Sequence, residues 1–307
     1  MGAIVVRFLA GSGRRWWNGV RMLLVCGAAA TLVGCAWLDA KQRELVFRPT
    51  PGQPSGFTGL RPGDLAFTLD VPGAKPGSTE RLHLWWLPHA DPQAPALLYL
   101  HGTFRNLYKN LPKIDALREA GFAVLAVDYR GWGDSTPIIP SEATIYADAN
   151  VAWAELVRHQ ADPRKRVIFG HSMGSGVAVE LASHLHVDHD YAALILESSF
   201  TRLPDVAKAV GILGTIASWF ATQEFDSESK IGKVDAPILM LHGTADHTVP
   251  IELGRRLFDA APKGTRWVQF EGGSHSGLDR ESPQQYQQAL HLLIEQIRSS
   301  PSPGAHP

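Results

Sequence analysis

A serine between glycines follows a short apolar run and precedes a segment with helical periodicity. From Arg166 to Ala178 the sequence reads Arg-Val-Ile-Phe-Gly-His-Ser-Met-Gly-Ser-Gly-Val-Ala, which contains Gly-x-Ser-x-Gly. The pattern predicts a tight strand-to-helix turn, in which a Cβ at Gly170 or Gly174 would strike the neighbouring strand or helix. Ser172 would then lie at the apex, near the positive end of a helix, as a nucleophile. The alternative is a helix N-cap after a glycine turn.

A nucleophilic serine needs a base, and the base needs a carboxylate. The hydroxyl reacts poorly near neutral pH, so a histidine must take its proton while an acid orients the ring. His275 directly follows the last apolar run, and Asp246 directly follows the run before it. The carboxyl ends of parallel strands meet at one edge of a sheet, where Ser172 also lies. The sequence therefore predicts Ser172, Asp246 and His275 as catalytic residues.

Other residues could fill these places or explain the pattern differently. Glu197, which ends another apolar run, could act as the acid in place of Asp246. Asp246 could instead cap the following helix, and His275 could be a surface loop residue. His242 is more typical of a structural turn, and His247 stands one residue beyond the expected acid.

Two backbone N–H groups must stabilise the oxyanion of a tetrahedral intermediate. One is expected from Met173, the residue after the nucleophile. The other is expected from the loop His-Gly-Thr-Phe that follows the first buried run, where Gly102 lets the backbone approach closely. We assign this donor to Thr103, with Phe104 as the alternative. His101 is expected to be a buried residue that binds the loop.

The positions of these residues require a sheet with helices on both faces. Two alternating segments predict antiparallel strands, each with one solvated face: Leu65–Leu69 and Arg81–Leu87. Six short apolar runs are typical of strands buried on both faces: Ala96–Leu100, Phe122–Val127, Arg166–Phe169, Tyr191–Leu196, Pro237–Leu241 and Arg266–Phe270. Between them, six segments have apolar residues near a 3.6 period: Leu111–Glu119, Ile145–His159, Ser172–Leu185, Leu203–Phe220, Leu253–Ala260 and Pro283–Arg298. This alternation predicts a mostly parallel sheet of the α/β class.

The first 35 residues have the pattern of a bacterial lipoprotein signal peptide. Arg14 and Arg15 precede an apolar stretch that ends in Leu-Val-Gly-Cys, and this ending resembles a lipobox. The resemblance implies cleavage before Cys35 and lipidation of its thiol, which would anchor the chain to a membrane of the cell envelope, the outer membrane where one exists. The alternatives are an uncleaved membrane anchor, or no membrane role. We expect a linker over 36–60, one domain over 61–298 and a disordered tail over 299–307.

Composition excludes several other classes of protein. Hydrophobic residues make up 45% of the chain, which is enough for a sizeable core. There are 29 basic and 30 acidic residues, so we expect no nucleic-acid partner. Two cysteines exclude a disulfide scaffold, and no histidine pair has metal-binding spacing, so we expect neither a metal nor another cofactor.

Several motifs together resemble the α/β-hydrolase superfamily over roughly residues 60 to 298. They are His101-Gly, Asp128-Tyr-Arg-Gly-Trp-Gly-Asp-Ser, Gly170-His-Ser-Met-Gly, Glu197-Ser-Ser-Phe-Thr, Leu241-His-Gly-Thr-Ala-Asp with Val249-Pro, and Gly272-Gly-Ser-His. Within the superfamily, the sequence is similar to the small-lid branch of serine aminopeptidase-like hydrolases and protein depalmitoylases. The resemblance implies the α/β-hydrolase fold and an acyl-enzyme mechanism without a cofactor.

The resemblance also places a small lid in the interval from Phe200 to Val234. This interval contains five bulky apolar residues, Ile212, Leu213, Ile216, Trp219 and Phe220. They predict either an amphipathic helix that closes the core or an apolar wall beside an acyl pocket.

We therefore expect a lipid-anchored serine hydrolase that acts on carboxylic esters or thioesters of small-molecule or lipid-like acyl substrates. If the protein is an enzyme of another class, a serine peptidase is the alternative. If it is not an enzyme, the alternative is a lipoprotein with a hydrolase fold that binds a ligand without turnover.

Overall fold

The computed structural model describes residues 34–209, 211 and 221–299, together with residues 17, 21, 22 and 25. The chain divides into two units, Met1–Leu45 and Val46–Pro307. Residues 34–47 are helical, although we expected a linker from residue 36. Most of the predicted signal peptide and nearly all of the predicted tail lie outside the described residues, as do the five apolar lid residues. Within the described part, no helix has the length and apolar character needed to cross a bilayer.

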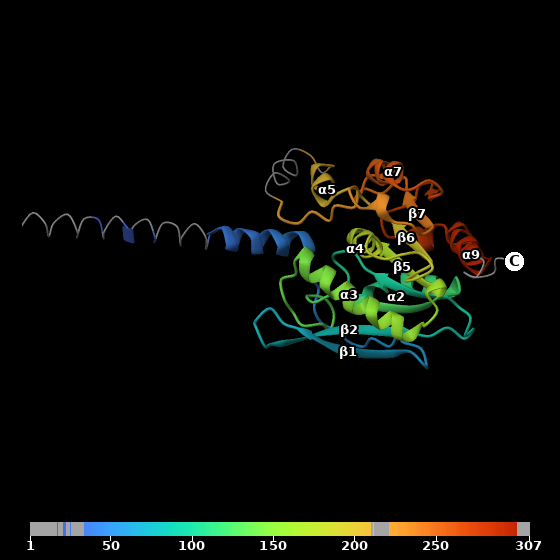
Figure 1. Cartoon of the computed structure of the whole chain (residues 1–307), viewed down its shortest axis with the longest axis horizontal. Helices are drawn as coiled ribbons and strands as arrows, with labels where there is room; N and C mark the ends of the chain where they lie inside the picture. The colour runs from blue at the N-terminus through green and yellow to red at the C-terminus, as the bar shows by residue number, and fades with distance from the viewer. Residues whose placement is uncertain are drawn as a thin grey trace, which may run out of the picture. The chain divides into compact units, whose positions relative to one another are not determined.

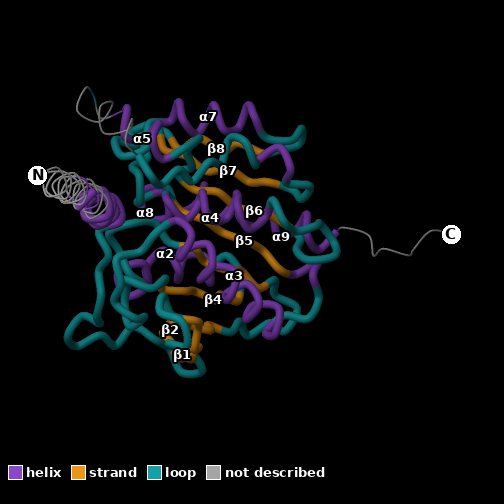
Figure 2. The backbone as a smooth tube through the Cα atoms, turned by 60° about the vertical axis from the view of Figure 1, so that its left-hand side comes forward, coloured by secondary structure: helices purple, strands orange, loops and turns teal. Residues whose placement is uncertain are grey.

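The second unit is built on one eight-stranded sheet, drawn in Figures 1 and 2. The strands lie in the order β1-β2-β4-β3-β5-β6-β7-β8. Only the pairs β1–β2 and β2–β4 are antiparallel, and all other neighbours are parallel. The bounds are β1 Leu65–Pro72, β2 Thr79–Leu87, β3 Ala96–Leu100, β4 Ala123–Asp128, β5 Arg166–His171, β6 Ala193–Glu197, β7 Ile238–Gly243 and β8 Arg266–Phe270. The predicted α/β-hydrolase fold class, with antiparallel N-terminal strands, is confirmed.

Helices cover both faces of the sheet. Their bounds are α2 Leu107–Glu119, α3 Glu142–His159, α4 Met173–Ala182, α5 Leu203–Ala209, α7 Ile251–Ala260, α8 Leu278–Glu281 and α9 Pro283–Ser299, with short 3₁₀ turns at Pro163–Lys165 and Ile231–Lys233. Helix α2 begins four residues before the predicted Leu111 because the Asn106 side chain caps its first turn. The predicted helix from Leu203 is helical to Ala209, and residues 212–220 are not described.

The buried strands divide their side chains between two cores, one on each face. Along β4, for example, Leu125 and Val127 belong to one core, whereas Val124 and Ala126 belong to the other. The first core also contains the apolar residues of α3 and α4, and the second contains those of α2 and α9. Side chains that alternate along a strand point to opposite faces. The continuous apolar runs in the sequence therefore reflect burial on both faces.

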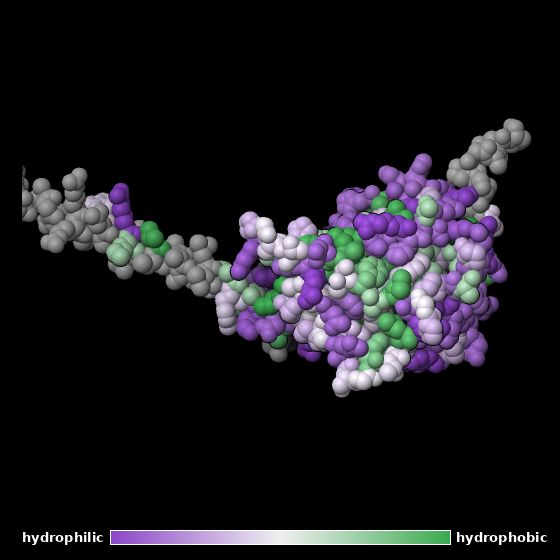
Figure 3. All heavy atoms as spheres, turned by 90° about the horizontal axis from the view of Figure 1, so that it is seen from below, coloured by the Kyte–Doolittle hydropathy of each residue, from purple (hydrophilic) through white to green (hydrophobic). Residues whose placement is uncertain are grey.

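Strand β2 differs from the prediction, because none of its residues from Leu82 to Leu87 is exposed to solvent. His83 is 5% exposed, and Leu84 and Trp85 are fully buried. The strand lies between β1 and β4, and the Trp85 ring stacks on Phe57 from the loop before β1, with ring centroids 5.6 Å apart. The edges of the sheet are β1, where Leu65 is 54% exposed, and β8. We expected Arg266–Phe270 to be buried on both faces, but in β8 only Phe270 is buried and the other four residues are half-buried, because no strand covers this edge. Seen from below, over β1 and β2, the surface mixes hydrophobic and hydrophilic residues (Figure 3).

Candidate active site

The turn at Ser172 is as tight as the sequence predicts. Ser172 joins β5 to α4 with φ 55° and ψ −124°, a conformation that costs a non-glycine residue about 1–3 kcal/mol. A Cβ on Gly170 would lie 2.2 Å from the carbonyl oxygen of Gly174, and one on Gly174 would lie 2.0 Å from that of Leu100 in β3. Both glycines are therefore required by backbone atoms, which cannot move aside as a flexible side chain can.

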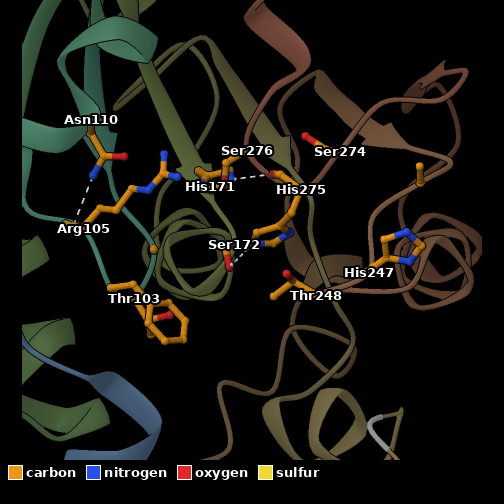
Figure 4. A pocket seen from close by; sticks show the side chains of 13 residues that line it. Thr103, Arg105, Asn110, His171, Ser172, His247, Thr248, Ser274, His275 and Ser276 are labelled. Carbon is orange, nitrogen blue, oxygen red and sulfur yellow. Dashed lines mark hydrogen bonds between the residues drawn. The ribbon is translucent and has the colours of Figure 1, made fainter. Parts of the chain in front are cut away.

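The structure brings the three predicted catalytic side chains together at the carboxyl edge of the sheet. Figure 4 shows two of them, Ser172 and His275, side by side. The Nε2 atom of His275 lies 2.9 Å from the hydroxyl oxygen of Ser172. The Nδ1 atom of the same ring lies 2.7 Å from Oδ2 of Asp246. The ring thus carries its proton on Nδ1 and offers Nε2 as the acceptor for the serine proton, which is the arrangement that activates a hydroxyl.

Asp246 is held as a buried carboxylate. Its Oδ1 atom accepts the backbone N–H groups of Thr248 at 2.9 Å and Val249 at 2.8 Å. Burial by itself would raise the pKa of Asp246, but hydrogen bonds from the rings of His242 and His275 outweigh it and lower the pKa well below its ordinary value. His242 also donates to the carbonyl of Val249 at 3.0 Å, which is the structural turn role expected of it. Asp246 therefore stays ionised near neutral pH.

Glu197, the alternative acid, belongs to a different cluster. Its Oε1 atom lies 2.5 Å from Nζ of Lys113, and its Oε2 atom accepts the Tyr286 hydroxyl at 2.8 Å. Lys113 also donates to Asp279 at 2.9 Å. All four side chains are buried. Because both carboxylate oxygens are already bound, Glu197 does not orient the ring of His275.

The loop that carries His275 is fixed through its backbone, by residues that the sequence did not reveal. The carbonyl oxygen of His275 accepts Nε2–H of His171 at 2.9 Å and the Ser198 hydroxyl at 3.0 Å. Burial, reinforced by the nearby charge of Lys113, lowers the pKa of His171 well below its ordinary value, so the ring is neutral. The only sequence signal for this contact was that His171 stands next to Ser172.

Thr103, one of the two expected oxyanion donors, lies across Ser172 from His275 in Figure 4. A Cβ on Gly102 would lie 2.9 Å from Cβ of Ser172, so the loop after β3 touches the nucleophile. Within the described part of the chain, the backbone N–H groups of Thr103 and Met173 have no hydrogen-bond acceptor. Phe104 follows with a positive φ of 70°, and the buried ring of His101 contacts the carbonyl oxygen of Gly102 at 2.6 Å. The N–H groups of Thr103, in this loop, and of Met173, after the nucleophile, are thus both available to an oxyanion.

A pocket of about 440 Å³ opens over these groups. Figure 4 shows Arg105 and Asn110 on one side, His247 on the other, and Ser172 and His275 between them. The remaining lining residues are Gly102, Thr103, Phe104, His171, Ala245, Thr248, Ser274 and Ser276. There is no aspartate or glutamate among the described residues that line the pocket. Among the described residues, no cluster of histidine, cysteine, aspartate and glutamate side chains is suited to holding a metal ion.

Comparisons with known proteins identify relatives of this chain and solved structures with the same fold. A family model described as serine aminopeptidase, S33, matches residues 91–226. The uncharacterized protein MT2364 of Mycobacterium tuberculosis is 31% identical over 255 residues, which cover 82% of this chain and 86% of that protein. A Danio rerio protein named lysophosphatidylserine lipase ABHD12 is 32% identical over 58% of this chain, which spans only 50% of that relative. The solved esterase Pf2001 of Pyrococcus furiosus shares the fold with a TM-score of 0.64 and 15% identity, over 81% of this chain and 97% of that one.

Proposed function

The chain belongs to the α/β-hydrolase family, and from this premise we propose that it is a serine hydrolase that cleaves carboxylic esters or thioesters through an acyl-enzyme on Ser172. One observation carries the proposal. The hydroxyl of Ser172, the ring of His275 and the carboxylate of Asp246 form a continuous chain, with contacts of 2.9 and 2.7 Å. In proteins, this order of groups activates a serine for acyl transfer.

In the proposed reaction, the Ser172 oxygen attacks the carbonyl carbon of the substrate while Nε2 of His275 takes the hydroxyl proton. The backbone N–H groups of Met173 and Thr103 donate to the oxyanion. Collapse of the intermediate releases the alcohol or thiol, which takes the proton from His275, and leaves an ester on Ser172. Water then gives a proton to His275 and attacks this ester. The acid is released, and the proton returns to the serine oxygen.

Esters and thioesters fit the pocket better than free amino-terminal peptides do. The protonated amine of such a peptide needs a carboxylate in the site, whereas the lining residues that the structure describes include none. The relative named lysophosphatidylserine lipase further supports an acyl ester of lipid-like character. A serine peptidase is the second candidate, because the matching family model is described as a serine aminopeptidase.

A fluorophosphonate probe tests the nucleophile. We expect the wild type to be labelled and Ser172→Ala not to be, while the control Ser183→Ala, at the end of α4, is labelled as the wild type is. A panel of p-nitrophenyl esters, acyl thioesters and aminoacyl anilides then separates the substrate classes. Unlabelled wild-type protein would contradict the acyl-enzyme, and turnover of the anilides alone would favour the peptidase.

We also propose that Cys35 is lipidated and anchors the protein to a membrane of the cell envelope. The proposal is supported by the Leu-Val-Gly-Cys ending and by the exposed free thiol of Cys35. Incorporation of an alkyne-labelled palmitate should be lost in Cys35→Ala and retained in the control Cys26→Ala. Equal membrane association of the two variants would contradict the anchor.

A further inference from the structure

An arginine without a charged partner lines the pocket beside the nucleophile. Arg105 is exposed, and within the described part of the chain its guanidinium forms no ion pair. We propose that this guanidinium binds an anionic group, a carboxylate or a phosphate, of the substrate. The proposal rests on the proposed function, and it narrows the substrates to acyl esters or thioesters that carry a negative charge away from the scissile bond.

The position of Arg105 is set by the same loop that forms the expected oxyanion hole. Gly102 contacts Ser172, and Arg105 stands three residues after Gly102 in the chain. The Cα atoms of Gly102 and Arg105 are therefore at most about 11 Å apart. Two contacts hold the backbone of Arg105. Its N–H donates to the carbonyl of Thr103 at 2.9 Å, and its own carbonyl accepts Nδ2–H of Asn110 at 3.2 Å. An anion at the guanidinium would thus lie several bonds from the reacting carbonyl.

The side chain of Arg105 extends into the pocket toward His171 and Ser276 in Figure 4. It also lines a small second depression, which adjoins the pocket and includes Lys109 and Arg280. Lys109 is exposed and, like Arg105, has no ion-pair partner among the residues that the structure describes. Positively charged side chains therefore extend from the pocket to its rim.

The acidic side chains near this rim are engaged by other groups: Glu281 accepts hydrogen bonds from the backbone N–H and the hydroxyl of Ser274, which lines the pocket. Asp279, which is the one acid among the described residues that line the second depression, lies 2.9 Å from Nζ of Lys113. Asp246 is bound behind the ring of His275. Residues 36–307 as a whole have 25 basic and 30 acidic groups, so a local excess of positive charge does not follow from composition. A cleft lined by charge of one sign concentrates ligands of the opposite sign.

The chemistry of arginine limits what this site recognises. Its planar guanidinium offers paired N–H donors that match both oxygens of a carboxylate or a phosphate. A carboxylate and a phosphate share this recognition chemistry, and the experiment must therefore separate them. A neutral lipid tail or a cationic amine would gain nothing from Arg105.

Three p-nitrophenyl esters of similar acyl length test the proposal: the pentanoate, the glutarate half-ester and the 4-phosphonobutanoate. The readout is the ratio of kcat/KM for each anionic ester to that for the pentanoate. We expect the wild type to favour at least one anion and this ratio to fall about tenfold in Arg105→Gln. Arg105→Glu should reverse the preference. The control Arg81→Gln, an exposed arginine of β2 outside the pocket, should keep the wild-type ratio.

The outcomes separate the two proposals. An equal ratio in wild type and Arg105→Gln would overturn the anion site while ester hydrolysis stands. If none of the esters is hydrolysed, calorimetric titration with pentylphosphonate and with pentanoate still decides the site. Binding that is lost in Arg105→Gln supports it, whereas equal or absent binding in both proteins overturns it. Comparison of the two anions shows whether the site takes phosphate or carboxylate groups.

Discussion

Replacing Lys113 by methionine tests the physical role of the buried charge cluster. The ammonium lies 2.5 Å from Glu197 and 2.9 Å from Asp279, and the side chains of the three residues are at most 5% exposed. Lys113→Met fills the space but leaves two carboxylates buried without their cation. Breaking a buried pair in this way costs about 3–5 kcal/mol of the free energy of unfolding. For a domain of this size, that corresponds to a fall in Tm of about 6–20 °C.

Thermal and urea unfolding of four proteins would measure this cost. They are the wild type, Lys113→Met, Glu197→Gln, and the double variant. If uncompensated charge causes the loss, Lys113→Met should cost less in the Glu197→Gln background, by about 1–3 kcal/mol. The matched control is Lys208→Met, because Lys208 is 45% exposed and its 3.1 Å contact with Asp205 should contribute only about 0–1 kcal/mol. Equal stabilities of Lys113→Met and Lys208→Met, or strictly additive losses in the cycle, would refute this reasoning.

Four further outcomes follow from the site. Asp246→Asn should lower kcat by about 10⁴, whereas Glu197→Gln should retain fluorophosphonate labelling. If Glu197→Gln were inactive and Asp246→Asn active, Glu197 would be the acid that orients His275. The pKa of Asp246 is lowered in the folded protein, so its ionised form stabilises the fold at pH values above 3.8, which is the ordinary pKa of an aspartate. The free energy of unfolding, measured at a series of acidic pH values, should show that this stabilisation is lost as the pH falls. His171→Phe should lower kcat roughly ten- to a hundredfold with little change in KM, and His171→Gln should restore part of it; a change in KM alone would argue against positioning. Gly174→Ala should lower the yield of folded protein or its Tm, whereas Gly232→Ala, whose Cβ would meet nothing closer than 3.8 Å, should not.

The order of strands and helices could be predicted from the sequence, and so could the turn at Ser172. Each of these depends on neighbours in the chain. A run of four to six apolar residues predicts a buried strand from local sequence alone, although the edge position of β8 leaves that strand only half-buried. The glycines around Ser172 serve a turn that involves only a few consecutive residues and the backbone next to them. The same local rule placed Asp246 and His275 at strand ends, so their meeting with Ser172 was predictable.

Only the tertiary structure decided between residues that satisfy the local rule equally well. Asp246 and Glu197 both stand at the carboxyl edge of the sheet, but Glu197 is bound by Lys113, 84 residues away in the chain. The burial of β2 depends on Phe57, which comes from a separate loop. Whether Arg105 has a partner likewise depends on which distant side chains reach it. A side chain's charge partners and solvent exposure are set by long-range packing, and no short stretch of sequence contains that information.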